Sequence, residues 1–418
     1  MAIKEYVLEK AKKAKLASRK MNSVDSRTKD KALKAMANAL LDNIDIIIEA
    51  NSVDMNNGRE AGLTKSFLDR LLLNKDRIED MAAGLIKVSA LQDPIGEALS
   101  MWKSPDNLTI AQVRVPLGVI GIIYEARPNV TVDAAGLCIK AGNTVILRGG
   151  SEAVNSNKTI AKIISDAGVE AGLPEGFLQY IENTDREAVN FLMRLNEYID
   201  VLIPRGGAGL IKAVVENATV PVIETGVGNC HVYVDESADF EMAKNIIINA
   251  KTQRPAVCNA METLLVHSSA ADKFLPFLQK EIKPYQVELR GCPKTISIIS
   301  GINEAIEEDW KTEYLDLIMA VKVVDSLEEA LDHIYKYGTK HSEVIVTKDY
   351  SKAQRFLNEV DAAAVYVNAS SRFTDGAQFG FGGEIGISTQ KLHARGPMGV
   401  KELTSTKYIV YGEGQIRK

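Results

Sequence analysis

One cysteine lies in a segment whose residue types favour a reactive thiolate. Cys258 follows Lys251 and Arg254, Pro255 ends any helix before it, and the polar Asn259 comes directly after it. Nearby cations and aimed amide groups lower the pKa of a thiol, whereas an apolar site raises it. The segment therefore fits a nucleophilic cysteine, or a buried structural cysteine, which is the usual fate of this residue.

The segments around the other three cysteines show fewer features that would favour a reactive thiolate. Cys138 lies in a pattern typical of a helix core, Cys230 opens an apolar strand, and Cys292, between Arg290 and Lys294, is the only rival thiol. No two cysteines form a CxxC pair, so neither a zinc site nor a disulfide framework is indicated. We therefore expect no metal and a reducing, cytoplasmic location.

Two glycine turns provide a second chemical pattern. Arg-Gly-Gly-Ser-Glu-Ala at 148–153 and Pro-Arg-Gly-Gly-Ala-Gly at 204–209 each follow a predicted strand and precede a predicted helix. Such turns let backbone amides and a helix N-terminus face a phosphate, and each carries one arginine. GxGxxG is absent, so the turns indicate either nucleotide binding or tight connections that need glycine only for their geometry.

Composition narrows the class of protein. The chain has 418 residues, 46% hydrophobic and 25% charged, which suggests two or three folded domains. Its net charge of −5 argues against a nucleic-acid or membrane-surface protein. The N-terminus lacks the apolar core of a signal peptide, and no stretch reaches the run of about 18 apolar residues that a membrane span requires.

The pattern of apolar residues changes near residue 108. Before it, helical spacing predicts helices at 6–17, 32–48 and 68–91, with caps at Ser26, Thr64 and Asn74. After it, an alternating strand at 109–116 is followed by a continuous apolar strand at 119–124. These signals indicate that an all-helical segment leads into a sheet.

Strands and helices then alternate in two series, which predicts parallel sheets covered by helices on both faces. The first series has strands at 144–147, 177–181, 201–203 and 220–223 and helices at 130–140, 156–171, 187–195 and 208–215. The second has strands at 261–267, 295–299, 317–324, 343–346 and 363–367 and helices at 270–283, 327–337 and 352–359. The last segment, 406–411, is a lone strand that needs a partner.

Together these pieces resemble the aldehyde dehydrogenase superfamily, and within it the gamma-glutamyl phosphate reductase family, nearly from end to end. The motifs that carry the resemblance lie at 116–131, 203–210, 224–231, 312–317, 368–376, 379–388 and 392–397. The resemblance implies two parallel-sheet α/β domains with a small β oligomerisation flap. The implied cofactor domain is 1–97 and 116–234, the catalytic domain 235–390, and the flap 98–115 and 391–418.

The resemblance also implies roles for individual residues. Cys258 is the nucleophile and Asn129 the side-chain donor to the developing oxyanion. Glu224 stands where related enzymes place a carboxylate that activates water, although it also fits as a cap of its own turn. The other implied roles are cofactor binding by Arg148, Gly149, Ser151, Arg205, Gly206, Gly207, Glu224 and Glu313, and substrate binding by Arg127 and Arg395.

Some of these roles have structural alternatives. Arg395 could anchor a substrate carboxylate or only tie down its loop, and Arg127 is similarly open. Residues 314–317 depart from the usual family pattern after Glu313. His231 fits a hydrogen-bonded core histidine, because no metal partner is spaced near it.

The implied activity is NADPH-dependent reduction of L-glutamyl 5-phosphate to L-glutamate 5-semialdehyde in proline biosynthesis, through a thioester on Cys258 and by a homo-oligomer. A hydrolytic aldehyde dehydrogenase, with Glu224 activating water, is the second reading. A third is a binding or scaffold protein that has kept the fold. Phosphate dependence separates the first two, and an unreactive thiol would favour the third.

Overall fold

The chain folds into two compact units. A computed structural model describes residues 2–417. The first unit contains the chain up to Thr225, Gly380–Gly386 and the segment from Met398, and the second contains Gly226–Phe379 and Ile387–Pro397. None of the described helices is long and apolar enough to cross a membrane. The boundaries of the three domains inferred above stay a prediction.

Helices form the N-terminal part of the first unit. Two long predicted helices are each divided: 32–48 is interrupted at Asn43, whose backbone is not helical, and 68–91 at Leu72–Asn74. The predicted caps Thr64 and Asn74 are confirmed, but Asp25, not Ser26, caps the second helix by accepting a hydrogen bond from the N–H of Thr28 at 2.7 Å. The helices are α1 (Ile3–Met21), α2 (Ser26–Asp42), α3 (Ile44–Glu60), α4 (Lys65–Leu71) and α5 (Lys75–Ser89).

A four-stranded parallel sheet is the centre of the first unit, with strand order β5-β4-β3-β6. Its strands are β3 (Val119–Tyr124), β4 (Thr144–Arg148), β5 (Leu178–Tyr180) and β6 (Val201–Arg205). Its helices are α6 (Asn129–Lys140), α7 (Val154–Glu170), α8 (Arg186–Leu192) and α9 (Ala208–Asn217), with the 3-10 turn η1 (Ser151–Ala153). The predicted strand 220–223 is wrong as a strand, because only Val222 pairs, with Leu202.

The carboxyl ends of β4 and β6 open into the two glycine turns. Both strands pair with the fully buried β3, one on each side, so the turns meet at the same edge of the sheet. Ligands of open α/β sheets bind at this edge, beyond the carboxyl ends of the strands. The fold therefore places both predicted phosphate-binding turns where a nucleotide site is expected.

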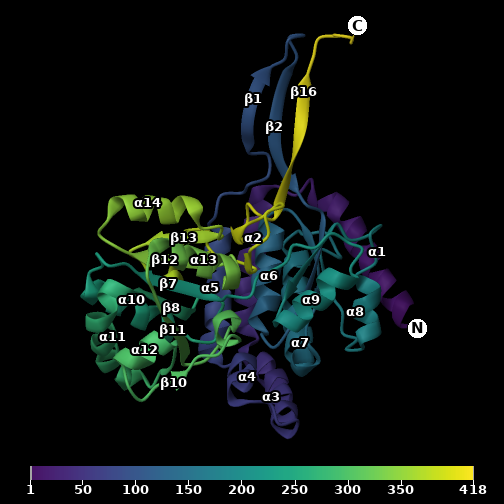
Figure 1. The fold of residues 1–418 in the computed structure, drawn as a ribbon. Coiled ribbons are helices and arrows are strands. Elements are labelled where there is room, and N and C mark those ends of the chain that lie inside the picture. The colour runs from purple at the N-terminus through teal and green to yellow at the C-terminus, as the bar shows by residue number, and fades with distance from the viewer. Residues whose placement is uncertain (1, 418) are drawn as a thin grey trace. The chain divides into compact units, whose positions relative to one another are not determined.

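The predicted lone C-terminal strand finds its partner within the first unit. β16 (Thr404–Tyr411) pairs antiparallel with β2 (Thr109–Pro116), which also pairs with β1 (Ala98–Lys103), as Figure 1 shows. Every residue of β1 is exposed, including the large apolar Met101 and Trp102. In the single chain, this small sheet therefore exposes apolar side chains to water.

A seven-stranded parallel sheet is the core of the second unit, with order β10-β9-β11-β8-β7-β12-β13. Its strands are β7 (Cys230–Val234), β8 (Met261–His267), β9 (Glu288–Gly291), β10 (Asn303–Glu304), β11 (Ile318–Val324), β12 (Ser342–Val346) and β13 (Ala364–Val367). Its α-helices are α10 (Phe240–Thr252), α11 (Ser268–Ile282), α12 (Pro293–Ile298), α13 (Leu327–Tyr337) and α14 (Tyr350–Glu359). Shorter elements are η2 (Lys283–Tyr285), η3 (Asp309–Lys311), η4 (Ser371–Phe373), β14 (Ile387–Ser388) and β15 (Gly396–Pro397).

The predicted strand 295–299 is wrong: most of it lies in α12. Its short run of Thr, Ile and Ser residues is ambiguous, because periodicity cannot separate a short strand from a short buried helix. Pro293 occupies the first helical turn, where its fixed φ suits a helix and its missing N–H costs nothing. The neighbouring place in the sheet is taken by β9, which pairs with β11.

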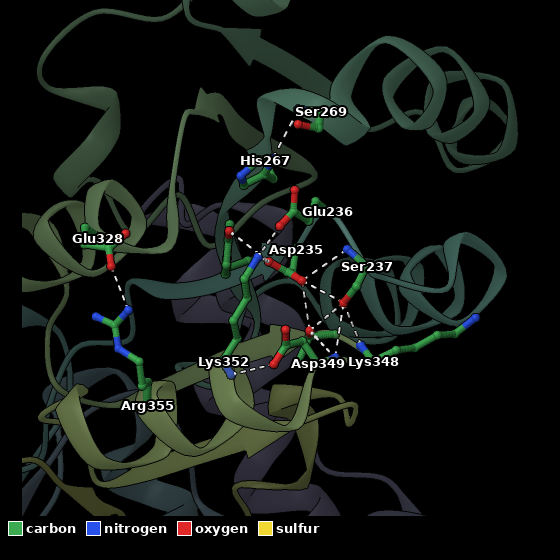
Figure 2. Close-up of polar contacts among 12 residues, drawn as sticks. Asp235, Glu236, Ser237, His267, Ser269, Glu328, Lys348, Asp349, Lys352 and Arg355 are labelled. Carbon is green, nitrogen blue, oxygen red and sulfur yellow. Dashed lines mark hydrogen bonds and ion pairs between the residues drawn. The ribbon is translucent and has the colours of Figure 1, made fainter.

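Polar contacts fasten the end of β7 to the end of β12. The carboxylate of Asp235, fully buried after β7, accepts hydrogen bonds from Ser237, Thr347 and Lys352, as Figure 2 shows for Ser237 and Lys352. Burial opposes the charge of Asp235, but these donors outweigh it and lower the pKa of Asp235 to about 2. The two strand ends are thus held by an ionised carboxylate.

Candidate active site

Cys258 lies in the loop between α10 and β8 and is partly exposed. The other three cysteines, Cys138, Cys230 and Cys292, are buried. Burial also raises the pKa values of the Cys138 and Cys230 thiols well above the ordinary range, which makes both poor nucleophiles. Of the four thiols, Cys258 is therefore the one that a substrate can reach.

The backbone of Cys258 is held closely on one side by residues 228–230. A Cβ atom at Gly228 would lie only 1.5 Å from the carbonyl oxygen of Cys258, so glycine alone permits this approach. The Cys230 thiol donates a hydrogen bond to the same oxygen at 3.2 Å. The N–H of Gly228 donates in turn to Oε1 of Glu313 at 2.7 Å. These contacts hold the backbone of Cys258 in place.

The other side of the loop is held by η4 and the residue after it. The Ser371 hydroxyl donates to the carbonyl of Asn259 at 2.7 Å, and the Asn259 amide donates to the carbonyl of Thr374 at 2.9 Å. Nε of Arg372 donates to Oε1 of Gln253 at 3.0 Å. The loop 253–259 is therefore tied to this segment near both of its ends.

The charges around the loop differ from the sequence-based expectation. Lys251 is fully buried, and its ammonium pairs with Glu262 at 2.5 Å. Burial disfavours both charges, lowering the pKa of Lys251 and raising that of Glu262 to about 7, while the pairing of the two groups opposes this effect. The positive charge of Lys251 is thus matched by Glu262.

Arg372 is a site residue that the sequence reading missed. Burial lowers the pKa of its guanidinium and the charge of Arg254 adds to this effect, while Asp375, Cys258 and Cys230 act in the opposite direction. The Arg372 side chain hydrogen-bonds Gln253 of the loop that carries Cys258, which places the guanidinium beside that loop. The only signal in the sequence was its place within the motif at 368–376.

Asn129, the predicted oxyanion donor, is the first residue of α6 in the first unit. Its side-chain amide donates to Oδ2 of Asp133 at 2.9 Å, one helical turn along. Burial raises the pKa of Asp133 to about 6. The i, i+4 spacing of Asn and Asp was readable in the sequence and predicts this contact, which orients the amide.

The first glycine turn contains an arginine with an unmatched nitrogen. Nη2 of Arg148 donates to the carbonyl of Thr184 at 2.7 Å, whereas its buried Nε has no hydrogen-bond partner among the residues that the structure describes. A Cβ at Gly149 would lie 2.2 Å from the Asn157 amide nitrogen, so the turn passes tightly against α7. Ser151 opens η1 just beyond it. The unpaired buried N–H fits an anionic ligand at this turn.

The second glycine turn already has an anion at its helix N-terminus. The N–H of Gly207 donates to Oε2 of Glu125 at 2.9 Å, and a Cβ at Gly206 would lie 2.5 Å from that oxygen. A carboxylate there is favoured by the helix dipole of α9. Glu125 therefore accepts the hydrogen bond from the Gly207 N–H, which the sequence analysis assigned to a phosphate. Arg205 is the positively charged residue of this turn.

The remaining predicted site residues fall in both units. Glu224 is partly buried in the first unit, next to Thr225, whose hydroxyl donates to the carbonyl of Pro204 at 2.9 Å. Arg127 is partly buried directly before α6. In the second unit, Arg395 pairs with Asp361 at 2.7 Å, which favours its structural alternative.

His231 is a core residue. It is fully buried, and its Nδ1 lies 3.0 Å from Oε2 of Glu343. Among the described residues, no group of three or more His, Cys, Asp or Glu residues is arranged to hold a metal ion.

Comparison with known proteins agrees with this geometry. The model of the aldehyde dehydrogenase family matches residues 2–296 and 306–409. The gamma-glutamyl phosphate reductases of Clostridium novyi and Clostridium acetobutylicum are 71% and 66% identical to this chain, and each match covers 100% of both sequences.

Solved structures show the same relationship. The crystal structure of gamma-glutamyl phosphate reductase from Thermotoga maritima has a TM-score of 0.96 and 54% identity, covering 99% of this chain and 100% of that one. An acetylating aldehyde dehydrogenase from Geobacillus thermoglucosidasius, at 20% identity, has a TM-score of 0.72 over 100% of this chain and 98% of its own, and shows the shared fold. The chain therefore belongs to the aldehyde dehydrogenase family and, within it, to the gamma-glutamyl phosphate reductases.

Proposed function

We propose that this chain uses Cys258 to reduce L-glutamyl 5-phosphate to L-glutamate 5-semialdehyde and inorganic phosphate in proline biosynthesis, with NADPH as reductant. The observation that carries the assignment of the nucleophile is the accessibility of Cys258, the only one of the four thiols that is not buried. Its backbone is fixed by Gly228 and Cys230, and a fixed nucleophile removes much of the entropy cost of the reaction.

The first chemical step forms a thioester. The thiolate of Cys258 attacks the acyl carbon of the substrate, the bond between that carbon and the phosphate oxygen breaks, and phosphate leaves with the electron pair. Asn129 is the proposed donor to the oxyanion that develops on the acyl oxygen. Asp133 holds one hydrogen of the Asn129 amide, which leaves the second available to the substrate.

The cofactor site proposed for the first unit fits an anionic nucleotide. Members of the family use a nicotinamide cofactor, which supplies the hydride that reduces the thioester when it is bound. Arg148, with its unpaired buried Nε, is the residue that we assign to the phosphate of the NADPH ribose, supported by Gly149 and Ser151. Arg205, Gly206 and Gly207 are assigned to the adjacent turn, where Glu125 must give way to any phosphate.

Two acidic residues complete the proposed site. Glu313 contacts the nicotinamide ribose in this proposal, although its Oε1 also accepts the hydrogen bond from Gly228. Glu224 serves the cofactor side, because a competent base next to the thioester would hydrolyse it. Arg127 is proposed to bind the substrate carboxylate. Arg395 is the weaker candidate for this role, because Asp361 already neutralises it.

The test is the reverse reaction, followed as NADPH absorbance with L-glutamate 5-semialdehyde and NADP+, with and without inorganic phosphate. We expect reduction of NADP+ that depends on phosphate. Turnover without phosphate would point instead to a hydrolytic dehydrogenase that uses Glu224 as base. Cys258→Ala should abolish turnover and leave cofactor binding nearly intact, whereas Cys292→Ala, the matched control, should retain turnover.

The assembly and location expected from the sequence stay predictions. Exposed apolar side chains on the small sheet, among them Met101 on β1 and Tyr408 on β16, support pairing with a second copy of the chain. Light scattering measures the oligomeric state, and Met101→Asp should reduce it. The cytoplasmic location is supported by the absence of disulfides among the four free cysteines.

A further inference from the structure

We propose that Arg372 binds the phosphoryl group of the acyl phosphate, and inorganic phosphate in the reverse direction. This proposal rests on the proposed function and adds the residue that recognises the leaving group. The geometry that supports it is the attachment of Arg372 to both ends of the loop that carries Cys258. Its Nε donates to Gln253, and its carbonyl accepts from the Asn259 amide at 3.4 Å.

The side chain of Arg372 is placed as a ligand-binding guanidinium would be. It is partly buried, and its Nε donates a hydrogen bond to the Gln253 side chain. The Nη1 and Nη2 groups of an arginine provide two parallel N–H donors, which match two phosphate oxygens. The hydrogen bond to Gln253 holds the guanidinium plane in a fixed orientation beside the loop.

The electrostatic surroundings of Arg372 include a carboxylate. Asp375 is the carboxylate whose charge acts on it, but Oδ1 of Asp375 accepts hydrogen bonds from the N–H groups of Ala377 at 2.9 Å and Gln378 at 3.1 Å. By contrast, Lys251 is paired with Glu262, and Arg395 with Asp361. Of these cations, Arg372 is therefore the one that we assign to the ligand.

The chemistry of the substrate selects the phosphoryl group as that ligand. The phosphate is joined directly to the carbon that the thiolate attacks, whereas three carbons separate that carbon from the α-carboxylate. A guanidinium held beside the loop that carries the thiol therefore suits the phosphate rather than the α-carboxylate. As the carbon–sulfur bond forms and the carbon–oxygen bond breaks, the phosphate takes the electron pair, and Arg372 stabilises the charge that it gains.

The experiment separates phosphate binding from the chemistry of the thiol. Mixing enzyme with NADP+ and L-glutamate 5-semialdehyde in the absence of phosphate gives a burst of about one NADPH per active thiol, because the thioester forms but is not released. Adding inorganic phosphate then starts turnover and yields KM for phosphate. Arg372→Gln should keep the burst and raise KM for phosphate roughly 10- to 100-fold, the range for one or two lost charge-assisted hydrogen bonds.

Two further variants sharpen the result. Arg372→Lys, which keeps the charge but loses the planar fork, should raise KM for phosphate by a smaller factor. Arg355→Gln is the matched control, because Arg355 is an exposed arginine of α14 paired with Glu328 and Glu359. We expect no change in KM for phosphate in this control, and the burst shows whether each variant is folded and competent.

Three outcomes would overturn the proposal. KM for phosphate that stays within about twofold of wild type would exclude phosphate binding by Arg372. A rise in KM for the semialdehyde alone would assign the arginine to the substrate carboxylate. A slower burst with a shifted pH profile, at unchanged KM for phosphate, would mean that Arg372 acts only on the thiolate. Absence of the burst in the wild type would instead contradict the proposed function.

Discussion

Gly228→Ala tests whether the close backbone approach positions Cys258. A Cβ at this position would lie 1.5 Å from the carbonyl oxygen, 2.3 Å from the carbonyl carbon and 2.6 Å from the Cα of Cys258. Because ordinary contact begins at 3.4 Å, the two segments must separate by about 1.9 Å, the difference between 3.4 and 1.5 Å. All three atoms are backbone, so no side-chain rotation relieves the clash.

The magnitude follows from the displacement. A misplacement of about 1 Å in an active site can cost 100-fold in rate. We therefore expect kcat of the phosphate-dependent reverse reaction to fall at least about 100-fold in Gly228→Ala, which corresponds to ~2.7 kcal/mol in activation free energy. Overpacking also costs stability, by about 1–3 kcal/mol, which urea denaturation measures separately.

A matched substitution shows whether the effect is local. Gly84 lies in α5, and a Cβ there would meet its nearest atom, Oδ1 of Asp133, at an ordinary 3.8 Å. Gly84→Ala should keep its activity and gain about 0.5–1 kcal/mol of stability from the helix. If Gly228→Ala is folded and keeps kcat within about tenfold of wild type, the contact does not position the nucleophile.

Three further predictions concern the two units separately. Arg148→Ala should weaken NADPH binding more than NADH binding, and fluorescence titration showing equal loss would remove this residue from phosphate recognition. Lys251→Met should lower the free energy of unfolding by about 3–5 kcal/mol, because Glu262 stays buried without its cation, and Lys251→Met with Glu262→Leu should recover most of the loss in urea denaturation. Burial raises the pKa of Asp133 to about 6, above an ordinary value of about 3.9, so the folded state retains a proton that the unfolded chain has lost. Stability from this group should therefore fall as pH rises through that window, and Asp133→Asn should flatten that part of the stability profile; an unchanged profile would contradict the raised pKa.

Much of the fold was predictable because its signals are local. The continuous apolar run of β3 and the alternation of strands and helices follow from short-range patterns, and the structure reproduces 119–124, 261–267 and 327–337 with the same bounds. The errors also have local causes. The predicted helix 32–48 is divided at Asn43, and the predicted strand 295–299 lies mostly in the helix α12. In both segments the apolar pattern fits more than one structure.

The sequence likewise indicated a reactive thiol at Cys258, but it did not indicate which charged residues surround that thiol. Loop residues around Cys258 indicated a nucleophile, and the exposure of this cysteine agrees with that interpretation. Which cation lies beside the loop depends on residues more than 100 positions away. Folding brings Arg372 into a hydrogen bond with Gln253 of the loop. Lys251, which is close to Cys258 in the sequence, forms an ion pair with Glu262 instead.

The sequence by itself therefore determined the family, the sheet class and the glycine turns and predicted the nucleophile, because each of these signals lies in contiguous residues. Only the tertiary structure decided which charges are matched and which remain for a ligand. Glu125 at the N-terminus of α9 and Asp361 on Arg395 show the same point: an ion pair depends on which side chains the folded chain brings within a few ångströms. Spacing along the chain does not encode that distance when the partners come from separate strands and loops.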